Sequence, residues 1–578
     1  MEQKVLVRAA IVHVLDVKRL IAAERARLLA HAGLAPLSQQ YRRPAERPFT
    51  ASERDGVTIL LGGLTSIHDR LITAVFETCG YRSSNLPPPD LQAFQLGRQY
   101  GNVGQCNPAY FTVGNLIKYV QNLEANGLSR EEIIDRYVFF TSGTCGPCRF
   151  GMYQSEYRLA LKNAGFQGFR VLTFEQNDGV KATSGEPGLK FSVHFGLTAL
   201  NAFNCSDALH DAIHHIRPYE VRDGDTNRAF DDVVHLLHAR LRDRRPFDIL
   251  EHTPGWLGRR LAAHPRVKDT TNTLVKIRQH LRGRSYRDAL AAARARLDEI
   301  EVDRLRVKPV VKITGEFWAA TTEGAGNFDM FRFLEREGAE IRVDPIGAWV
   351  MYLLHQAKAR AAVERRVGRP ERILSLAALA NELTFARKHL LFSIGERMWT
   401  REYHRVVRAL GDVAERLVPQ AELARLAHPF YHSMTRGGEG HLEIGKTIYY
   451  TTHRRCHMVL SLKPFGCLPS TQSDGAQSAV VARVKDLIFL PIETSGEGEL
   501  NAHSRVQMAL GEAKAAARRE FEDALSRTGR TLDEIRTEVA ARPALRRPSY
   551  RVPRHEGIAG TAANFVLHVG RLMGGKRQ

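Results

Sequence analysis

Four cysteines stand in loops whose composition suits the binding of a metal or a metal cluster. Cys106 lies in GNVGQCNPAY, Cys145 and Cys148 form the sequence CGPC, and Cys467 lies in KPFGCLPST. The CGPC sequence directly follows an expected strand and opens a helix, where backbone N–H groups stabilise a thiolate and lower the pKa of its thiol. Thiolates in such loops are good ligands for iron–sulfur clusters. We therefore predict that these four cysteines bind a metal.

Glycines accompany each of these cysteines. Gly104, Gly146 and Gly466 stand one or two residues from a predicted metal ligand. A glycine lets the backbone approach a bulky inorganic group, and a neighbouring proline fixes the path of the loop. We predict that these three glycines line the cofactor.

The other three cysteines, Cys79, Cys205 and Cys456, are expected to be ordinary structural residues. Cys79 lies on the apolar face of an expected helix, and Cys205 lies between two helical runs. The odd total of seven cysteines in a long chain argues against a framework of disulfides. Clustered cysteines in a reducing compartment indicate metal or redox chemistry instead.

Two other interpretations of the CGPC sequence stay open. The first is dithiol exchange of the thioredoxin type, in which Pro187 would face the two cysteines. No tryptophan precedes CGPC, however, and a polar, glycine-rich loop surrounds Pro187. The second is a structural zinc site, for which His453 with Cys456 or His457 would have to supply a loosely spaced second pair of ligands.

Two carboxylates are candidates for proton transfer. Glu316, in ITGEFW, follows an expected strand, and Glu493 opens the loop ETSGEGELNAHSR after the strand DLIFLP. Either could act as a general acid or base. The alternative for each is a carboxylate that caps a helix or lies on the surface.

A pattern of a β-branched run, a glycine-rich loop and a helical stretch recurs along the chain. It occurs at residues 57–80, 137–165 and 310–318 and again at 458–467 and 485–510. Strands that alternate with helices indicate parallel βαβ units, so we predict an α/β protein with several doubly wound parallel sheets and helical insertions. Ligands of such sheets bind beyond the carboxyl ends of the strands, where the cysteine loops lie.

These patterns divide the chain into six predicted parts. The helical stretches at about 189–306 and 370–430 are expected to serve either as a scaffold or as a surface for a dimer. In order the six parts are an N-terminal helical segment (1–54), an α/β domain with Cys106 and CGPC (55–216), a helical region (217–306), an α/β domain with helices (307–430), a C-terminal α/β domain with KPFGC (431–540) and a basic tail (541–578).

The composition favours anionic partners. The formal net charge is +20, and residues 541–578 hold eight Lys or Arg against the single acid Glu556. This tail is expected to be loosely ordered, and binding of nucleic acid is disfavoured because no recognition motif accompanies it. No apolar stretch reaches the roughly 18 residues that a transmembrane helix needs. The charged first residues also lack the features of a signal peptide, so we expect a cytoplasmic protein.

The strings GNVGQCNPAYFTVGNLIKYV, TSGTCGPCRFGMYQSEYRLALKNAGF and SLKPFGCLPSTQSDGAQ resemble the 2-hydroxyacyl-CoA dehydratase and benzoyl-CoA reductase superfamily. The resemblance extends over about residues 55–525. Within the superfamily, the strings are most similar to the large proteins described as related to the activase of acyl-CoA dehydratase. It implies flavodoxin-like α/β domains and a [4Fe–4S] or double-cubane cluster held by cysteines. By position Cys106, Cys148 and Cys467 match the motif cysteines best, and Cys145 follows.

The resemblance also implies a role. The chain would be the cluster-binding component of a dehydratase or reductase that acts on an acyl-CoA or a similar small substrate. A separate ATPase would deliver its low-potential electrons, because this chain lacks a phosphate-binding ATPase motif. Gln105 stands where the family pattern has an acidic residue, which weakens the transfer of a specific reaction. An accessory electron-transfer protein without a substrate of its own remains the alternative.

Overall fold

The computed structural model describes most of the chain in two compact units, Met1–Arg47 and Pro48–Gln578. In the first unit, residues 20–31 form a helix, and the rest of the predicted segment 1–54 lies largely outside the described residues. All elements below belong to the second unit. The described residues are 20–33, 46–143, 148–175, 179–180, 188–244, 247–253, 255–256, 263–367, 376–435 and 438–574.

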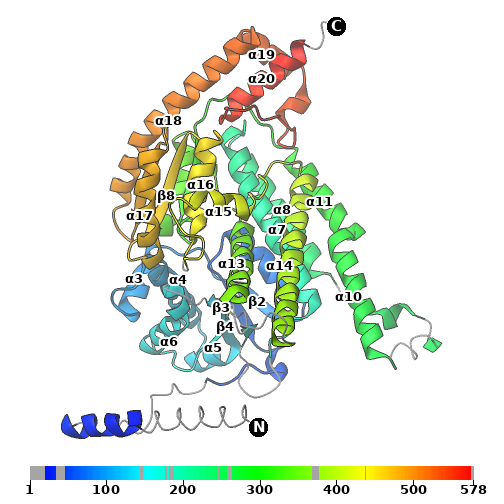
Figure 1. The fold of residues 1–578 in the computed structure, drawn as a ribbon. Helices are drawn as coiled ribbons and strands as arrows, with labels where there is room; N and C mark the ends of the chain where they lie inside the picture. Colours follow the sequence, from blue (N-terminus) through cyan, green and yellow to red (C-terminus); the bar gives the residue numbers. More distant parts are fainter. Residues whose placement is uncertain are drawn as a thin grey trace. The chain divides into compact units, whose positions relative to one another are not determined.

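The first sheet has the strand order β2-β1-β3-β4-β5. Strands β2, β3 and β4 are labelled in Figure 1. The first four strands of the sheet are parallel, and only the short β5 pairs antiparallel to β4. The helices in the connections between the parallel strands are α2 to α6. The bounds are β1 Thr58–Leu61, α2 Ser66–Glu77, β2 Arg82–Asn85, α3 Leu91–Tyr100, α4 Asn107–Ala125, α5 Arg130–Arg136, β3 Tyr137–Gly143, α6 Tyr153–Asn163, β4 Arg170–Glu175 and β5 Gly179–Val180.

The second sheet, β7-β6-β8-β9, is parallel throughout and repeats the strand order of the first. Its central strands β6 and β8 are buried at every residue, as expected for strands covered on both faces. The prediction of parallel α/β architecture is therefore confirmed. The bounds are β6 Val310–Gly315, α12 Met330–Arg336, β7 Glu340–Arg342, α16 His441–Thr452, β8 Met458–Pro464, α17 Leu468–Arg483, β9 Phe489–Thr494 and α18 Glu499–Thr528.

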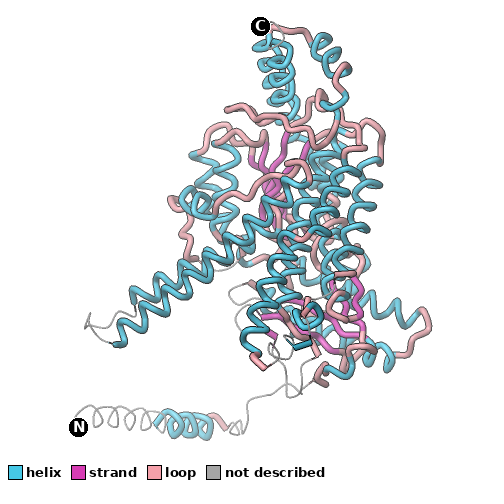
Figure 2. The backbone as a smooth tube through the Cα atoms, turned by 90° about the vertical axis from the view of Figure 1, so that its right-hand side faces the viewer, coloured by secondary structure: helices cyan, strands magenta, loops and turns pink. Residues whose placement is uncertain are grey.

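Long helices surround the two groups of strands, which Figure 2 shows as separate. Helices α2, α7, α8, α11 and α14 bury a common apolar core against the first sheet. Helices α13 and α14 pack against each other. No helix among the described residues is both long and apolar enough to cross a membrane. The bounds are α7 Val193–Ile216, α8 Asp225–Arg242, α10 Pro265–Arg282, α11 Arg284–Leu297, α13 Ile346–Val367, α14 Leu376–Ala409 and α15 Gln420–Ala427.

Two predictions about the organisation of the chain are wrong. The stretches 307–430 and 431–540, predicted as separate domains, contribute strands to one sheet, because β8 pairs directly with β6. The basic tail is not a loose end, because α20 (Thr561–Gly574) buries Phe565 and Val566 against α18 and α19 (Leu532–Ala540). The amphipathic pattern of this helix is difficult to recognise in the sequence because several arginines precede it.

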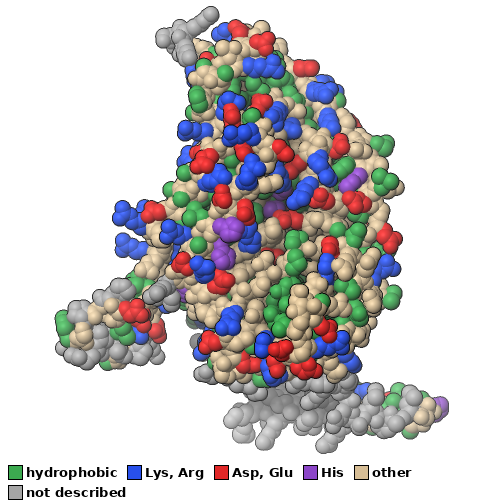
Figure 3. All heavy atoms as spheres, turned by 180° about the vertical axis from the view of Figure 1, so that it is seen from behind, with side chains coloured by type: hydrophobic (Ala, Val, Ile, Leu, Met, Phe, Trp, Pro, Cys, Tyr) green, Lys and Arg blue, Asp and Glu red, His purple; other side chains and the backbone are tan. Residues whose placement is uncertain are grey.

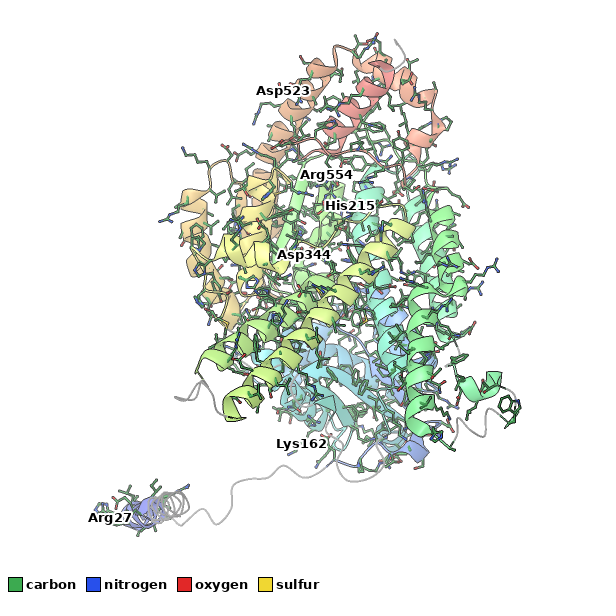
Figure 4. All side chains as sticks on the ribbon, turned by 45° about the vertical axis from the view of Figure 1, so that its right-hand side comes forward. Arg27, Lys162, His215, Asp344, Asp523 and Arg554 are labelled. Carbon is green, nitrogen blue, oxygen red and sulfur yellow. The ribbon has the colours of Figure 1, made fainter. Side chains whose placement is uncertain are left out.

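A buried ion network holds the second sheet to its surroundings. Arg342 on β7 forms an ion pair with Glu340 and lies 3.1 Å from the carboxylate of Glu415. Arg342 also lies 2.8 Å from Nδ1 of His215 on α7, and Arg554 pairs with Glu415 from the C-terminal segment. His215 and Arg554 are labelled in Figure 4. The network therefore connects a strand, a long helix and the C-terminal segment.

Lys312 shows how the sheet accommodates charge in a central strand. Its side chain is fully buried, and its Nζ lies 2.7 Å from Asp344, which also pairs with Lys446 at 2.9 Å. Asp344 is labelled beside the second sheet in Figure 4. On the exterior, basic and acidic side chains alternate over the face seen in Figure 3, without a continuous basic patch.

Candidate functional site

Cys106 stands at the N-terminus of α4, with a proline in the first turn of the helix. Its side chain is buried, and its Sγ lies 3.0 Å from the hydroxyl oxygen of Tyr153. Helix α4 is held in place by a very close crossing with α3. A Cβ at Gly97 would lie 1.9 Å from the carbonyl oxygen of Tyr110, so only glycine fits there. The crossing thereby sets the position of Cys106.

Cys148 lies after β3 and immediately before the short 3₁₀ helix Arg149–Met152. The backbone N–H of Phe150 donates to its Sγ at 3.5 Å. The guanidinium of Arg149 donates to the carbonyl oxygen of Gly104, which has a positive φ of 80°. This bond ties the loop of Cys148 to the loop of Cys106.

The predicted ligand Cys145 and the predicted cofactor-lining Gly146 lie outside the described residues. The dithiol-exchange alternative needs Cys145 and Pro187, and Pro187 also lies outside them.

Cys467 stands at the N-terminus of α17, directly after β8. The loop before it contacts the loop of Cys106 closely. A Cβ added to Gly466, whose φ is +74°, would lie 3.4 Å from the carbonyl oxygen of Gln105 and 3.5 Å from the Cα of Cys106. The N–H of Asn107 donates to the carbonyl oxygen of Phe465 at 3.1 Å. One cysteine loop from each sheet therefore meets the other at Gly466.

Glu316 is the carboxyl whose charge acts on Cys106, Cys148 and Cys467, the three predicted ligands that the structure describes. It follows β6, its N–H donates to the carbonyl oxygen of Leu462 at 2.9 Å, and its Oε2 accepts from the N–H of Ala319 at 3.0 Å. Burial is the main cause that raises the pKa of each thiol, and the charge of Glu316 is a smaller cause for all three; together such effects raise the pKa of Cys148 to about 12. The charge of one buried carboxyl therefore acts on thiols from three separate loops.

Tyr153 belongs to the same group of side chains. Burial raises the pKa of its hydroxyl well above the usual value, and the charges of Cys106, Glu316 and Cys148 raise it further. A tyrosine so placed stays protonated and can donate a hydrogen bond to a sulfur atom. It stands at the start of α6, where sequence reasoning did not identify it.

Glu439 is a second carboxylate of the site that sequence reasoning missed. Its Oε1 accepts the backbone N–H of Phe317 at 2.6 Å. Burial, with the charge of Glu316 next in size, raises the pKa of Glu439 to about 8. Glu439 also raises the pKa of Cys148 and of Cys467. The only sequence signal was the string GGEGH, in which flanking glycines permit close approach to a ligand.

The site is consequently rich in acidic groups and poor in positive charge. The pKa shifts of its thiols, carboxyls and tyrosine all favour the protonated, uncharged forms. Arg149 acts in the opposite direction on Cys106, with a smaller effect than burial. A positively charged group placed among these side chains would be stabilised by them, and would allow the thiols to ionise.

The arrangement of these side chains does not suit a single metal ion. Among the described residues, no group of three or more His, Cys, Asp or Glu side chains is arranged to hold one ion. The second ligand pair proposed for zinc is engaged elsewhere: His457 accepts from the N–H of Val310 at 2.9 Å, and His453 stacks on Tyr449.

The structure also describes Glu493 and the three cysteines that were expected to be structural. Glu493 lies on β9 opposite Lys463 of β8, and its side chain is exposed. Cys79 packs against the core of the first sheet, and Cys205 is fully buried with its Sγ 3.3 Å from the hydroxyl of Tyr286. Burial raises the pKa of both Cys205 and Cys456 to about 12.

Comparisons with known proteins add no relative: no family model, no curated protein and no solved structure matches this chain. The resemblance stated above therefore depends on the three cysteine-containing strings alone.

Proposed function

We propose that this chain is an iron–sulfur protein of the 2-hydroxyacyl-CoA dehydratase type, with a cluster held by Cys106, Cys148 and Cys467. The observation that carries the proposal is that the loops of these three cysteines, from both sheets, contact one another: the loop of Cys467 meets that of Cys106 at Gly466, and Arg149 beside Cys148 donates to the carbonyl oxygen of Gly104. Cys145 is the candidate for a fourth ligand. Four cysteines would saturate a [4Fe–4S] cluster and suit electron transfer, whereas three would leave one iron open to a substrate.

The chemistry of the donor set supports a cluster. Each of the three cysteines directly precedes a helix, α4 for Cys106, α17 for Cys467 and the short 3₁₀ helix for Cys148, so its thiol belongs to a residue beside the N–H groups of a first turn. Burial alone opposes ionisation of these thiols, but iron displaces the thiol proton on binding, as metals do at thiolate sites. The binding of iron would therefore supply the positive charge that the site lacks and would release protons.

The topology supports the finer part of the fold proposal. Both sheets have the order second, first, third and fourth strand, which is the beginning of the flavodoxin-like order. In such sheets the ligand site lies beyond the carboxyl ends of the strands, where Cys148, Glu316 and Cys467 lie. We therefore describe the two halves as flavodoxin-like domains with helical insertions.

The two carboxyls give the site a means of holding protons beside the sulfurs. With a pKa of about 8, Glu439 is mainly protonated at neutral pH, and the pKa of Glu316 is also raised by burial. Glu316 is therefore the better supported of the two predicted catalytic residues, and Glu439 replaces Glu493 as its partner. A bound cluster would supply one-electron reduction, and these carboxyls would hold or donate a proton beside it.

The rest of the proposal follows from the resemblance. The chain would receive low-potential electrons from a separate ATP-dependent activator, in the cytoplasm, and would act on an acyl-CoA or a comparable small molecule. It would serve as the lyase or oxidoreductase component and could form a dimer. An electron-transfer role without a substrate is the alternative, and turnover of a 2-hydroxyacyl-CoA with a supplied activating ATPase separates the two.

Anaerobic purification with quantification of iron and sulfide tests the proposal. We expect a brown protein with about four irons and four sulfides, or twice that number for a double cubane. Cys148→Ser should lose most of the iron and the visible absorption. The matched control Cys79→Ser, whose thiol packs against the core of the first sheet, should keep both. A colourless, iron-free wild-type protein after anaerobic reconstitution would refute the proposal, as would full iron content in Cys148→Ser.

A further inference from the structure

A cavity of about 550 Å³ lies apart from the three cysteines. Its walls come from the start of α2, from α7 and α8, and from the loop between β6 and α12. The cavity thus lies beyond the carboxyl ends of β1 and β6, which are the equivalent strands of the two sheets. This is the usual place for a ligand in a doubly wound fold, and the volume is that of a small-molecule site.

The wall formed by the loop after β6 and by α7 carries polar atoms without partners. The buried amide of Asn327 donates to the carbonyl oxygens of Ala319, at 3.1 Å, and Thr322, at 2.8 Å. Its Oδ1 can therefore only accept, and this atom has no hydrogen-bond partner among the described residues. Nε2 of His210, a residue only 3% exposed, also lacks a hydrogen-bond partner there. Buried atoms of this kind are rare and costly, and a ligand would satisfy them.

Glu323 adds a carboxylate to the same wall. Its Oε1 lies 3.8 Å from Nε2 of His210, too far for a hydrogen bond, and the side chain is about one-third exposed. His210 stays uncharged, because burial and the charges of His214 and His68 hold its pKa well below the usual value. The wall therefore offers two oxygen acceptors and a neutral imidazole. It fits a ligand group that donates several hydrogen bonds and carries a positive charge.

Asp69, beside the lining residue Arg70 on α2, is a second carboxyl near Glu323, although it is not among the residues that line the cavity. Its pKa is raised to about 7, mainly by burial and to a smaller extent by the charge of Glu323. A single metal ion is not indicated, because no described group of three ligating side chains is arranged to hold one. A primary ammonium group needs only acceptors in suitable directions and no fixed coordination geometry.

Basic side chains border the cavity from other elements. Arg70 on α2 lies 2.7 Å from Asp231, and Arg217 lies 2.6 Å from Glu335, so these guanidinium groups are already neutralised. Arg332 on α12 also lines the cavity, is exposed, and forms no ion pair with any described residue. It is therefore available for an anionic group of a ligand, in the manner typical of arginine and carboxylate.

We propose that this cavity binds a small zwitterion of the amino-acid type. The ammonium group would contact Glu323, Asn327 and His210, and the carboxylate would contact Arg332. The proposal is independent of the cysteine site, although one loop borders both, since Glu316 and Glu323 lie on the same connection after β6.

Titration calorimetry of the full chain with each of the twenty amino acids tests the proposal. We expect saturable binding of at least one, and no binding of methylammonium or acetate alone, because each satisfies only one end. Glu323→Gln should weaken binding roughly ten- to a hundred-fold, since a hydrogen bond to a charged group is lost. Arg332→Ala should weaken it at least several-fold.

The control is Glu131→Gln, an exposed carboxylate on α5 outside the cavity lining, which should bind as the wild type does. Circular dichroism of each variant checks that it is folded. If no amino acid binds, the proposal is wrong. It is also wrong if Glu323→Gln retains the affinity of the wild type. A third contrary result is that Zn²⁺ or Mg²⁺ binds to the wild type, that Glu323→Gln abolishes this binding, and that no amino acid binds.

Discussion

At the crossing of α3 and α4, a methyl group added to Gly114 would come closer to another backbone atom than one added to any other glycine in the described part of the chain. A Cβ at Gly114 would lie 1.7 Å from the carbonyl oxygen of Ala93 and 2.5 Å from the backbone nitrogen of Gly97. Such contacts are not tolerated below about 3.0 Å, so Gly114→Ala requires the two helices to separate by about 1.3 Å. Both obstacles are backbone atoms of a packed helix, which no change of side-chain rotamer can move.

Overpacking of this kind costs typically about 1–3 kcal/mol, and the backbone clash places Gly114→Ala at about 3 kcal/mol or above. Because α4 begins directly after Cys106, the same shift should move its sulfur relative to Gly466 and lower the iron content in the reconstitution described above. The assay is urea-induced unfolding followed by far-UV circular dichroism, with the midpoint compared between variant and wild type.

Gly511→Ala is the matched control, because Gly511 lies in α18 and an added Cβ would meet nothing within 4 Å. Alanine in the interior of a helix is favoured over glycine by roughly 1 kcal/mol, so this variant should be as stable as the wild type or more so. The reasoning is refuted if Gly114→Ala unfolds at the same urea concentration as the wild type, or if both variants are destabilised equally.

Two further predictions concern charge. A folded-state pKa raised from 4.5 to about 8 means that Glu439 favours folding below pH 4.5 and that this contribution is lost as the pH rises through about 8. In the wild type, the free energy of unfolding should therefore fall between pH 4.5 and about 8. At about 1.4 kcal/mol per pKa unit, Glu439→Gln should make this fall smaller by several kcal/mol, and an unchanged pH profile would contradict the assignment. Arg342→Ala should cost about 3–5 kcal/mol, because it leaves Glu340 and Glu415 buried without their shared partner. Arg425→Ala, which breaks an exposed pair, should change the urea midpoint little, and equal losses in the two variants would be inconsistent with the network.

The local part of this structure was predictable from the sequence. Cys148 and Cys467 follow β-branched runs and stand among glycines and prolines, which is enough to place them at strand ends before a helix. The position of Glu316 after β6 follows in the same way. These features depend only on neighbouring residues, and the structure has them where the patterns indicate.

The features that sequence reasoning missed depend on contacts between distant segments. Glu439 follows no strand, and its role arises from the N–H of Phe317 and the charge of Glu316, which lie in another part of the chain. The pairing of β8 with β6 also cannot be predicted from local periodicity, because β7 and the helices α12 to α16 lie between the two strands in the chain. The exposed position of Glu493 within β9 could not be read either, because a loop and a strand end look alike in one sequence.

The meeting of the two cysteine loops at Gly466 has a consequence for the order of assembly. Cys106 and Cys148 are synthesised early, whereas Cys467 leaves the ribosome only after most of the chain has been made. A nascent polypeptide therefore exposes two sulfur atoms for a long interval before the third can close over them. Under the proposed function, iron that bound during that interval would meet only part of its ligand set, so we expect the cluster to form after translation is complete.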